Sequence, residues 1–239
     1  MNEETLVTVH GYAGDQHQIE AFMPWYLHHD APVIVMSPED SPIYKINSAP
    51  TVICRWAGRR AYIGQPSLDR QLTHLRIALD HPFNYFLLND SDSFCLSPKL
   101  PQYLYEEDFF WSNEVGEPRP HSSPYPKIAM QPPYFVSRRN LEKMVAVAPR
   151  ISAHPITPYI DWYMLALVRE AGIAHRSFWD KELDHGTPHP TEAIARDPWE
   201  EMYDRVRNHG RVLVHPIKNL ACATRLAEEH ANYKRLHER

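Results

Sequence analysis

Two short apolar runs that each end in a polar cluster restrict the possible folds most strongly. They are residues 32–36 (PVIVM) and residues 83–88 (FNYFLL), and acidic and hydroxyl side chains directly follow both of them. A strand that is apolar on both faces is typical of a parallel sheet buried under helices. The pattern therefore predicts a buried sheet whose strands carry polar groups at their carboxyl ends.

Strand-like and helical segments alternate along the rest of the chain. Further strands are predicted at residues 6–10, 51–55, 108–112 and 211–215. Helices are predicted at residues 16–29, from a cap at Ser67 to residue 79, 140–148, 161–171 and 220–238. The proline-rich residues 114–133 are expected to form an irregular excursion. The alternation predicts an α/β fold with a mainly parallel central sheet flanked by helices, in one domain over residues 1–219 with the helix of residues 220–239 packed on it.

The composition excludes several classes of protein. A net charge of -5 is unfavourable for a protein that coats nucleic acid without specificity. The cysteines, Cys54, Cys95 and Cys222, are too few and too widely spaced for a disulfide framework or a zinc site. No apolar run approaches the roughly 20 residues of a membrane-spanning helix, and the acidic N-terminus does not resemble a secretory signal. We expect a cytoplasmic protein with reduced thiols and no membrane contact.

The junction after residues 83–88 is the most informative point in the sequence. Asp90 and Asp92 follow this strand two residues apart, so on an extended backbone their carboxylates point to the same side and can approach one ion. Oxygen ligands of this kind suit Mg²⁺ or Mn²⁺, which keep substrate phosphate oxygens in their remaining positions. Asp, Asn and Ser after a strand are also ordinary turn formers, so a purely structural explanation stays open.

A second polar cluster follows the strand predicted near the C-terminus. His215 ends this strand, and Lys218 comes three residues later. An imidazole can complete a metal site with the two aspartates, and an ammonium is a point charge for phosphate. His215 taken alone equally fits a buried histidine beside a proline turn. The joint pattern predicts a site for a cation and a diphosphate.

Five segments together resemble a GT-A glycosyltransferase, a Rossmann-like family. They are VTVHGYAGDQHQIE (7–20), YFLLNDSDSF (85–94), PPYFVSRRNLEKM (132–144), YIDWYMLALVREAGI (159–173) and HPIK (215–218). More narrowly, the arrangement is similar to small glycosyltransferases encoded by bacteriophages, including those linked to hypermodified DNA bases. The resemblance spans residues 6–218.

The resemblance implies a role for each matching residue. Asp90 and Asp92 match the metal and nucleotide motif, with His215 as a third protein ligand and Lys218 for phosphate. The nucleoside would be held by the turn after the first strand and by a residue after the second, namely His10, Gly11, Tyr12 and Asp15, and Ser37 or Glu39.

Asp161 matches the catalytic base of inverting members. Ile160 precedes it where the family commonly has Glu, so inversion or retention stays open. An aspartate at the start of a helix also stabilises the helix dipole, which is the structural alternative for this residue.

The implied activity is transfer of a sugar, hexosyltransferase-like, from a nucleoside diphosphate donor to a hydroxyl acceptor, with Mn²⁺ or Mg²⁺ as cofactor. We expect a UDP-sugar as donor and, from the narrower resemblance, a 5-hydroxymethylpyrimidine in DNA as acceptor, framed by the proline-rich segment and by arginine clusters. Arg138 and Arg139 form one of these clusters, and they equally fit a solvated helix start. The alternatives are a glycan or protein acceptor, a nucleotidyl- or phosphotransferase that uses the same carboxylates, and a non-catalytic nucleotide-sugar-binding module.

Overall fold

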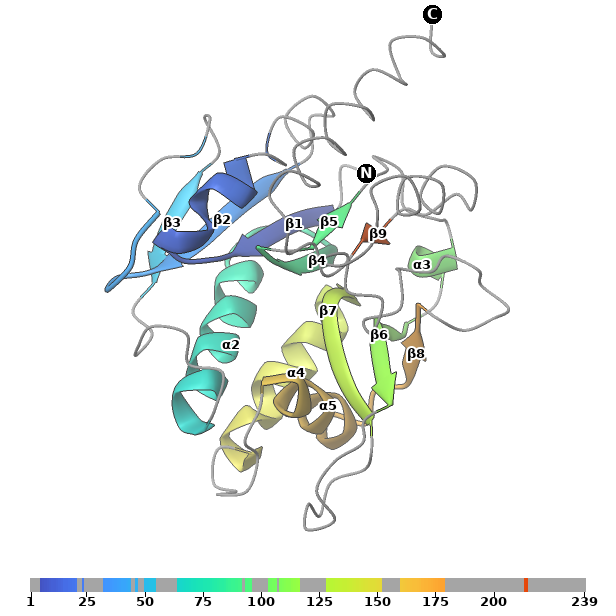
Figure 1. The fold of residues 1–239 in the computed structure, drawn as a ribbon. Helices are drawn as coiled ribbons and strands as arrows, with labels where there is room; N and C mark the ends of the chain where they lie inside the picture. Colours follow the sequence, from blue (N-terminus) through green and yellow to red (C-terminus); the bar gives the residue numbers. More distant parts are fainter. Residues whose placement is uncertain are drawn as a thin grey trace, which may run out of the picture.

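A computed structural model of the chain shows a central sheet with helices packed against it (Figure 1). It describes residues 5–20, 23, 32–43, 46, 50–54, 64–91, 93–95, 103–106, 108–116, 128–151, 160–178 and 213–214. The strands are β1 (Thr5–His10), β2 (Val33–Pro38), β3 (Thr51–Cys54), β4 (Tyr85–Asp90), β5 (Phe94–Cys95), β6 (Phe110–Gly116), β7 (Ile128–Ser137), β8 (His175–Ser177) and β9 (Leu213–Val214). The helices are η1 (Ala13–Asp15), α2 (Gly64–Leu79), α3 (Tyr103–Glu106), α4 (Arg138–Ile151) and α5 (Ile160–Glu170).

The main sheet has seven strands in the order β3-β2-β1-β4-β7-β6-β8. Strands β1, β2, β3 and β4 are parallel to one another, β6 is parallel to β8, and β7 is antiparallel to both of its neighbours. The prediction of an α/β fold with a mainly parallel sheet is therefore confirmed. Because β1, β2 and β4 are parallel neighbours, their carboxyl ends lie at one edge of the sheet.

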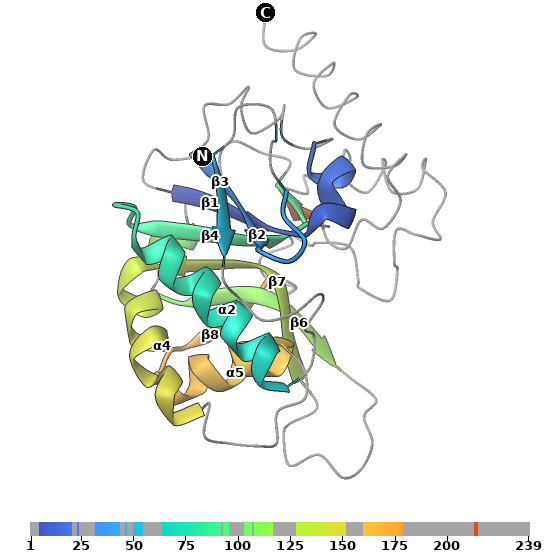
Figure 2. The ribbon, with the colours of Figure 1, turned by 90° about the vertical axis from the view of Figure 1, so that its left-hand side faces the viewer.

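Helices α2, α4 and α5 cover one face of the sheet (Figure 2). Alternate strand residues such as Leu6, Phe86 and Val136 point to this face and join Leu75 and Met144 of the helices in one buried cluster. Each such side chain contributes about 1.5–3 kcal/mol by its removal from water. On the other face, Tyr105 of α3 packs against the rings of Tyr85 and Phe135. None of the described helices is long and apolar enough to cross a membrane.

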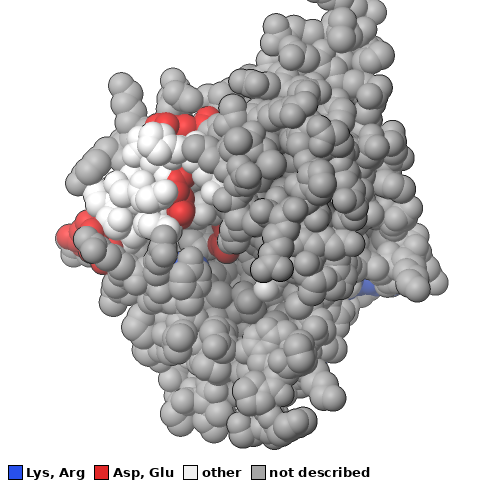
Figure 3. Space-filling model, viewed as in Figure 1, with Lys and Arg blue, Asp and Glu red and all other residues white. Residues whose placement is uncertain are grey.

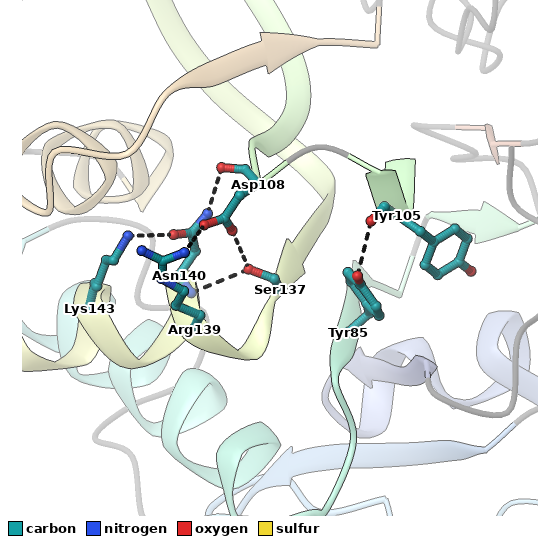
Figure 4. A network of polar contacts seen from close by, with 7 residues as sticks. All are labelled: Tyr85, Tyr105, Asp108, Ser137, Arg139, Asn140 and Lys143. Carbon is teal, nitrogen blue, oxygen red and sulfur yellow. Dashed lines mark hydrogen bonds and ion pairs between the residues drawn. The ribbon is translucent and has the colours of Figure 1, made fainter. Parts of the chain in front are cut away.

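The N-terminal ends of α2 and α4 differ in whether a serine caps them. Helix α2 begins at Gly64, so the prediction that Ser67 caps it is wrong, and Ser67 lies in its first turn. Helix α4 follows β7 directly, and the Ser137 hydroxyl oxygen accepts a bond from the Asn140 amide at 3.4 Å. Asp108 ties this start to the rest of the fold, because its carboxylate accepts from the Ser137 hydroxyl at 2.7 Å and its carbonyl from the Asn140 side chain at 3.0 Å (Figure 4).

Arg138 also serves the fold. Its guanidinium donates to the backbone carbonyls of Leu79, His81 and Phe83, which lie at and beyond the end of α2. It sits at the amino end of β4, where Ser137 pairs with Tyr85, and so at the edge of the sheet opposite to Asp90. Arg138 therefore holds α2 to α4 and is not placed to contact an acceptor near Asp90.

The predicted irregular excursion over residues 114–133 is wrong at both ends. Strand β6 continues to Gly116, and β7 begins at Ile128 and runs through Pro132 and Pro133. A proline cannot donate to a strand ladder, so an internal strand normally excludes it. Here β7 pairs with β4 only from Tyr134 onward, and its ladder with β6 is interrupted between Gln131 and Phe135. The two prolines therefore lie where neither neighbouring strand needs their missing amides.

Several predicted segments lie outside the described residues. The predicted helix of residues 16–29 is described at residues 16–20 and 23, which are helical. The predicted terminal helix and the domain boundary near residue 219 fall outside the described ranges, so both stay predictions.

Candidate functional site

The candidate site lies where β1, β2 and β4 end. His10, the last residue of β1, pairs with Asp90 at the end of β4 and with Met36 in β2. The amide of Gly11 then donates to the Met36 carbonyl at 3.0 Å, which holds the turn after β1 against the end of β2. Ligands of parallel α/β sheets bind beyond such carboxyl ends. The fold thus brings the predicted residues of the first, second and fourth strands to one place.

His10 and Asp90 are in direct contact. The Nδ1 atom of His10 lies 2.8 Å from Oδ1 of Asp90 and 3.2 Å from the carbonyl oxygen of Asn89. His10 is 6% exposed, whereas 27% of the Asp90 side chain is exposed. One oxygen of Asp90 is therefore held from inside the fold, and the carboxylate still reaches the surface at the carboxyl edge of β4.

A second buried histidine lies behind this pair. His74 of α2 places its Nε2 atom 2.6 Å from the Thr8 hydroxyl oxygen, and its ring meets that of His10 edge-on with 5.0 Å between centroids. Burial, and then the neighbouring charges of His10 and Arg70, hold the pKa of His74 well below its ordinary value. His74 is therefore neutral at neutral pH, so it does not compete as a cation for the carboxylate of Asp90.

The turn after β1 depends on two close approaches at glycine. A Cβ atom on Gly11 would lie 2.7 Å from the Ile19 side chain, and one on Gly14 would lie 2.5 Å from the Tyr12 ring. The turn is closed by reciprocal bonds: the Tyr12 amide donates to the Asp15 carboxylate at 3.3 Å, and the Asp15 amide donates to the Tyr12 carbonyl at 2.8 Å. The predicted nucleoside-binding turn is thus compact, and its side chains are partly exposed at Tyr12 and Asp15.

The two candidates after β2 differ in their surroundings. Ser37 is buried, and its hydroxyl accepts from the Ile43 amide at 2.7 Å and donates to the Ser41 carbonyl at 3.3 Å. Glu39 is exposed in the turn that follows. Acidic side chains appear in red over the described part of the face in Figure 3. Ser37 therefore shapes the loop from inside, and Glu39 is the one of the two that faces solvent.

A short second sheet pairs the residue before the C-terminal motif with a residue shortly after Asp90. In this sheet β5 pairs with β9, with Phe94 opposite Val214 and Cys95 opposite Leu213. Phe94 follows Asp90 by four residues, and Val214 directly precedes His215 in the chain. The described pairing ends at Val214, and the position of His215 itself stays a prediction.

Four predicted site residues have no described side chain. Asp92, His215 and Lys218 lie outside the described residues, and Asp161 is described only as the second residue of α5. Within the described part of the chain, no group of three or more His, Cys, Asp or Glu side chains forms a metal site. The three-ligand site predicted from Asp90, Asp92 and His215 stays a prediction.

The contact between His10 and Asp90 is a feature of the candidate site that the sequence analysis does not predict. The alternation of β1 was a signal for it, since Thr8 and His10 share the face of Leu6. His74 gave a similar signal, because it stands between Leu72 and Leu75 on the apolar side of α2. Polar residues at positions that the pattern reserves for the core indicate a buried polar cluster.

The pKa of His175, which lies far from this site, predicts how the stability of the fold depends on pH. Burial, and then the charge of Arg169, lowers the pKa of His175 from 6.5 to about 4, while its Nε2 atom contacts the Ser112 hydroxyl at 2.9 Å. The unfolded chain therefore binds this proton first as the pH falls. The free energy of unfolding is expected to fall between pH 6.5 and about pH 4, and His74 acts in the same direction.

His175→Gln tests this expectation, because its amide can keep the Ser112 hydrogen bond without titrating. Urea unfolding at several pH values should show a shallower decline for the variant than for the unchanged protein. His17→Gln is the matched control, since the His17 side chain is 82% exposed. Equal slopes for all three proteins would contradict the assignment.

Comparison with known proteins supports the fold. No protein-family model and no curated protein sequence matches the chain. Among solved structures, the chain is similar to WbbM, a bifunctional glycosyltransferase in its apo form, with a TM-score of 0.50 and 9% identity over 98% of this chain. It spans about half of that protein, 52% of its length. A glycosyltransferase involved in the glycosylation of the major capsid of PBCV-1 matches with a TM-score of 0.45 and 13% identity, covering 94% of this chain and 98% of the other. The chain therefore shares its α/β fold with a glycosyltransferase of known structure.

Proposed function

We propose that the chain is a metal-dependent glycosyltransferase that moves a sugar from a nucleoside diphosphate sugar, a UDP-sugar, to a hydroxyl acceptor. The observation that carries the proposal is the position of Asp90. It ends β4 at the carboxyl edge of the sheet, in register with His10. The β5–β9 pair sets Val214, the residue before His215, opposite Phe94, which follows Asp90 by four residues. This arrangement supports a site built from both parts of the sequence motif.

The residues proposed for this site are of the kinds that bind a divalent cation. Asp90 and Asp92 offer carboxylate oxygens and His215 an imidazole, a donor set that suits Mn²⁺ or Mg²⁺. When bound, the ion supplies Lewis-acid stabilisation of the charge that develops on the diphosphate leaving group. Lys218 holds the diphosphate by its positive charge.

The donor nucleoside is proposed to lie over the turn after β1. Gly11, Tyr12 and Asp15 form this turn, and the exposed Glu39 follows the neighbouring strand β2. An aromatic ring such as that of Tyr12 can stack on a base. Carboxylates such as those of Asp15 and Glu39 can accept hydrogen bonds from ribose hydroxyls. Both groups lie on the same side of Asp90 at this sheet edge, because β1 lies between β2 and β4.

For the acceptor, we propose that Asp161 accepts the proton of the attacking hydroxyl. A positioned general base contributes roughly a hundred- to ten-thousand-fold to the rate. The acceptor class proposed from the sequence resemblance is a 5-hydroxymethylpyrimidine in DNA. Sugar transfer to hydroxymethylated DNA, measured against the same DNA without the hydroxymethyl group and against glycan acceptors, decides between the acceptor classes.

Thermal unfolding with nucleotide sugars tests the donor and the metal together. A ligand at about 100 times its Kd stabilises the folded state by about 2.7 kcal/mol, which raises Tm by roughly 5–10 °C in a chain of this size. We expect this rise for UDP-sugars with Mn²⁺ and a much smaller one without the metal. Slow release of UDP and free sugar should accompany binding. A shift with nucleoside triphosphates alone would favour a nucleotidyltransferase, and binding without turnover on any acceptor would favour a non-catalytic module.

A further inference from the structure

We propose that His10 is a positioning residue, which holds Oδ1 of Asp90 through its Nδ1–H group and so orients the carboxylate for the cation. The inference rests on the proposed function, since it concerns the same site. It replaces the role in nucleoside binding that the sequence resemblance implies for His10.

The contacts of the ring fix where its proton lies. Nδ1 of His10 is within hydrogen-bond distance of two atoms, a carboxylate oxygen of Asp90 at 2.8 Å and the Asn89 carbonyl oxygen at 3.2 Å. An ionised carboxylate and a carbonyl only accept hydrogen bonds. Nδ1 must therefore carry a hydrogen and donate it. The shorter contact is with Asp90, so the carboxylate is the main acceptor.

The surroundings of His10 oppose a direct contact with a nucleoside. The residue is 6% exposed, and one edge of its ring is already bonded to Asp90. Tyr12 and Asp15 lie further along the turn and are partly exposed, so they remain the groups that face a donor. His10 therefore acts through Asp90.

Two further contacts hold the imidazole in this orientation. The backbone of His10 is paired on both sides, with Asp90 in β4 and with Met36 in β2. The ring of His74 meets the ring of His10 edge-on, and His74 is itself bonded to Thr8. The donor group thus belongs to a rigid element and not to a mobile loop, which is what the orientation of a metal-binding carboxylate requires.

The expected effect follows from this arrangement. Loss of a residue that orients a metal ligand typically lowers metal affinity or activity by about 10–100-fold. In His10→Ala the Asp90 carboxylate loses its internal hydrogen bond and rotates more freely, so we expect a loss of Mn²⁺ affinity in that range. Because His10→Ala changes none of the residues proposed to contact the sugar, the loss should be in Mn²⁺ affinity.

Two conservative variants separate positioning from packing. The side-chain amide of asparagine lies close to where Nδ1 of histidine lies, whereas that of glutamine lies close to Nε2. His10→Asn is therefore expected to recover most of the Mn²⁺ affinity that His10→Ala loses, because it keeps the hydrogen bond to Asp90. His10→Gln is expected to resemble His10→Ala, although it keeps more of the ring volume.

The measurement is a titration of free Mn²⁺ by electron paramagnetic resonance, with kcat and KM for UDP-sugar hydrolysis, on folded variants checked by thermal unfolding. Nitrogen NMR of the unchanged protein adds a test that needs no variant, because it reports whether Nδ1 of His10 carries a hydrogen. An unprotonated Nδ1, or equal Mn²⁺ affinity in the His10→Ala, His10→Asn and His10→Gln proteins, would overturn the proposal.

The failure of the proposal can be told from failure of the proposed function. If Asp90→Asn loses Mn²⁺ binding while His10→Ala binds as the unchanged protein does, the positioning role is wrong and the glycosyltransferase site stands. If the unchanged protein and Asp90→Asn show the same lack of metal-dependent binding, the proposed function fails, and the role of His10 fails with it.

Discussion

Asp90→Asn is expected to lower metal-dependent turnover of the nucleotide sugar by roughly a thousandfold. The change removes a negative charge from the end of β4 and keeps the shape of the side chain. A bound cation contributes several kcal/mol of charge stabilisation, and each ~1.4 kcal/mol corresponds to a factor of ten in rate. The amide oxygen of asparagine can still accept the hydrogen bond from His10, so the fold should be retained. The measurement is UDP release at saturating Mn²⁺ and donor.

Asp80→Asn is the matched control for this variant. Asp80 is exposed in the turn after α2, so its substitution changes the net charge equally without touching the carboxyl edge of the sheet. Turnover by Asp80→Asn should equal that of the unchanged protein. If Asp90→Asn also retains full metal-dependent turnover, Asp90 does not bind the cation and the proposed site is wrong.

Asp161→Asn is expected to lower kcat for sugar transfer by roughly a hundred- to ten-thousand-fold, because an amide cannot take the proton of the acceptor hydroxyl. Donor binding should be unchanged. The residue is the second of α5, and the following turn is anchored by Tyr163, Met164 and Leu165, which are all buried. The substitution therefore leaves the backbone of the helix in place, and the thermal shift with UDP-sugar and Mn²⁺ should persist.

Glu170→Gln gives the control on the same helix. Glu170 lies at the other end of α5 in an exposed ion pair with Arg150 at 3.0 Å, so its loss should not affect transfer. If Asp161→Asn transfers sugar normally and loses only about 0.3–1 kcal/mol of stability, Asp161 does no more than stabilise the helix dipole.

The sequence predicted most of the fold because the signals for its elements are local. The apolar runs of β1, β2 and β4 placed these strands to within two residues, since a buried strand requires apolar side chains on both faces. Strand β7 was missed because Pro132 and Pro133 are strong breakers on local grounds. Their tolerance depends on where the ladders to β4 and β6 stop, which is a property of the assembled sheet.

The candidate site was predictable to a smaller extent. The carboxylate pair could be predicted because Asp90 and Asp92 are only two residues apart in the sequence. The structure places Asp90 at the expected edge of the sheet. The partner of His10 could not be read in this way, because it depends on the register between β1 and β4, two strands separated by most of the first half of the domain. Asp92, His215, Lys218 and the side chain of Asp161 remain predictions.

The proline pair of β7 has a consequence for the shape of the sheet at its carboxyl edge. Strand β4 stays bonded to β1 as far as Asp90, but its pairing with β7 stops at Leu88, opposite Tyr134. Extending that pairing by one residue would set Pro133 against Asn89, and a proline has no amide to offer. The strand pairing of Asn89 and Asp90 is therefore with β1, and the two prolines mark the point where the ladder between β4 and β7 ends.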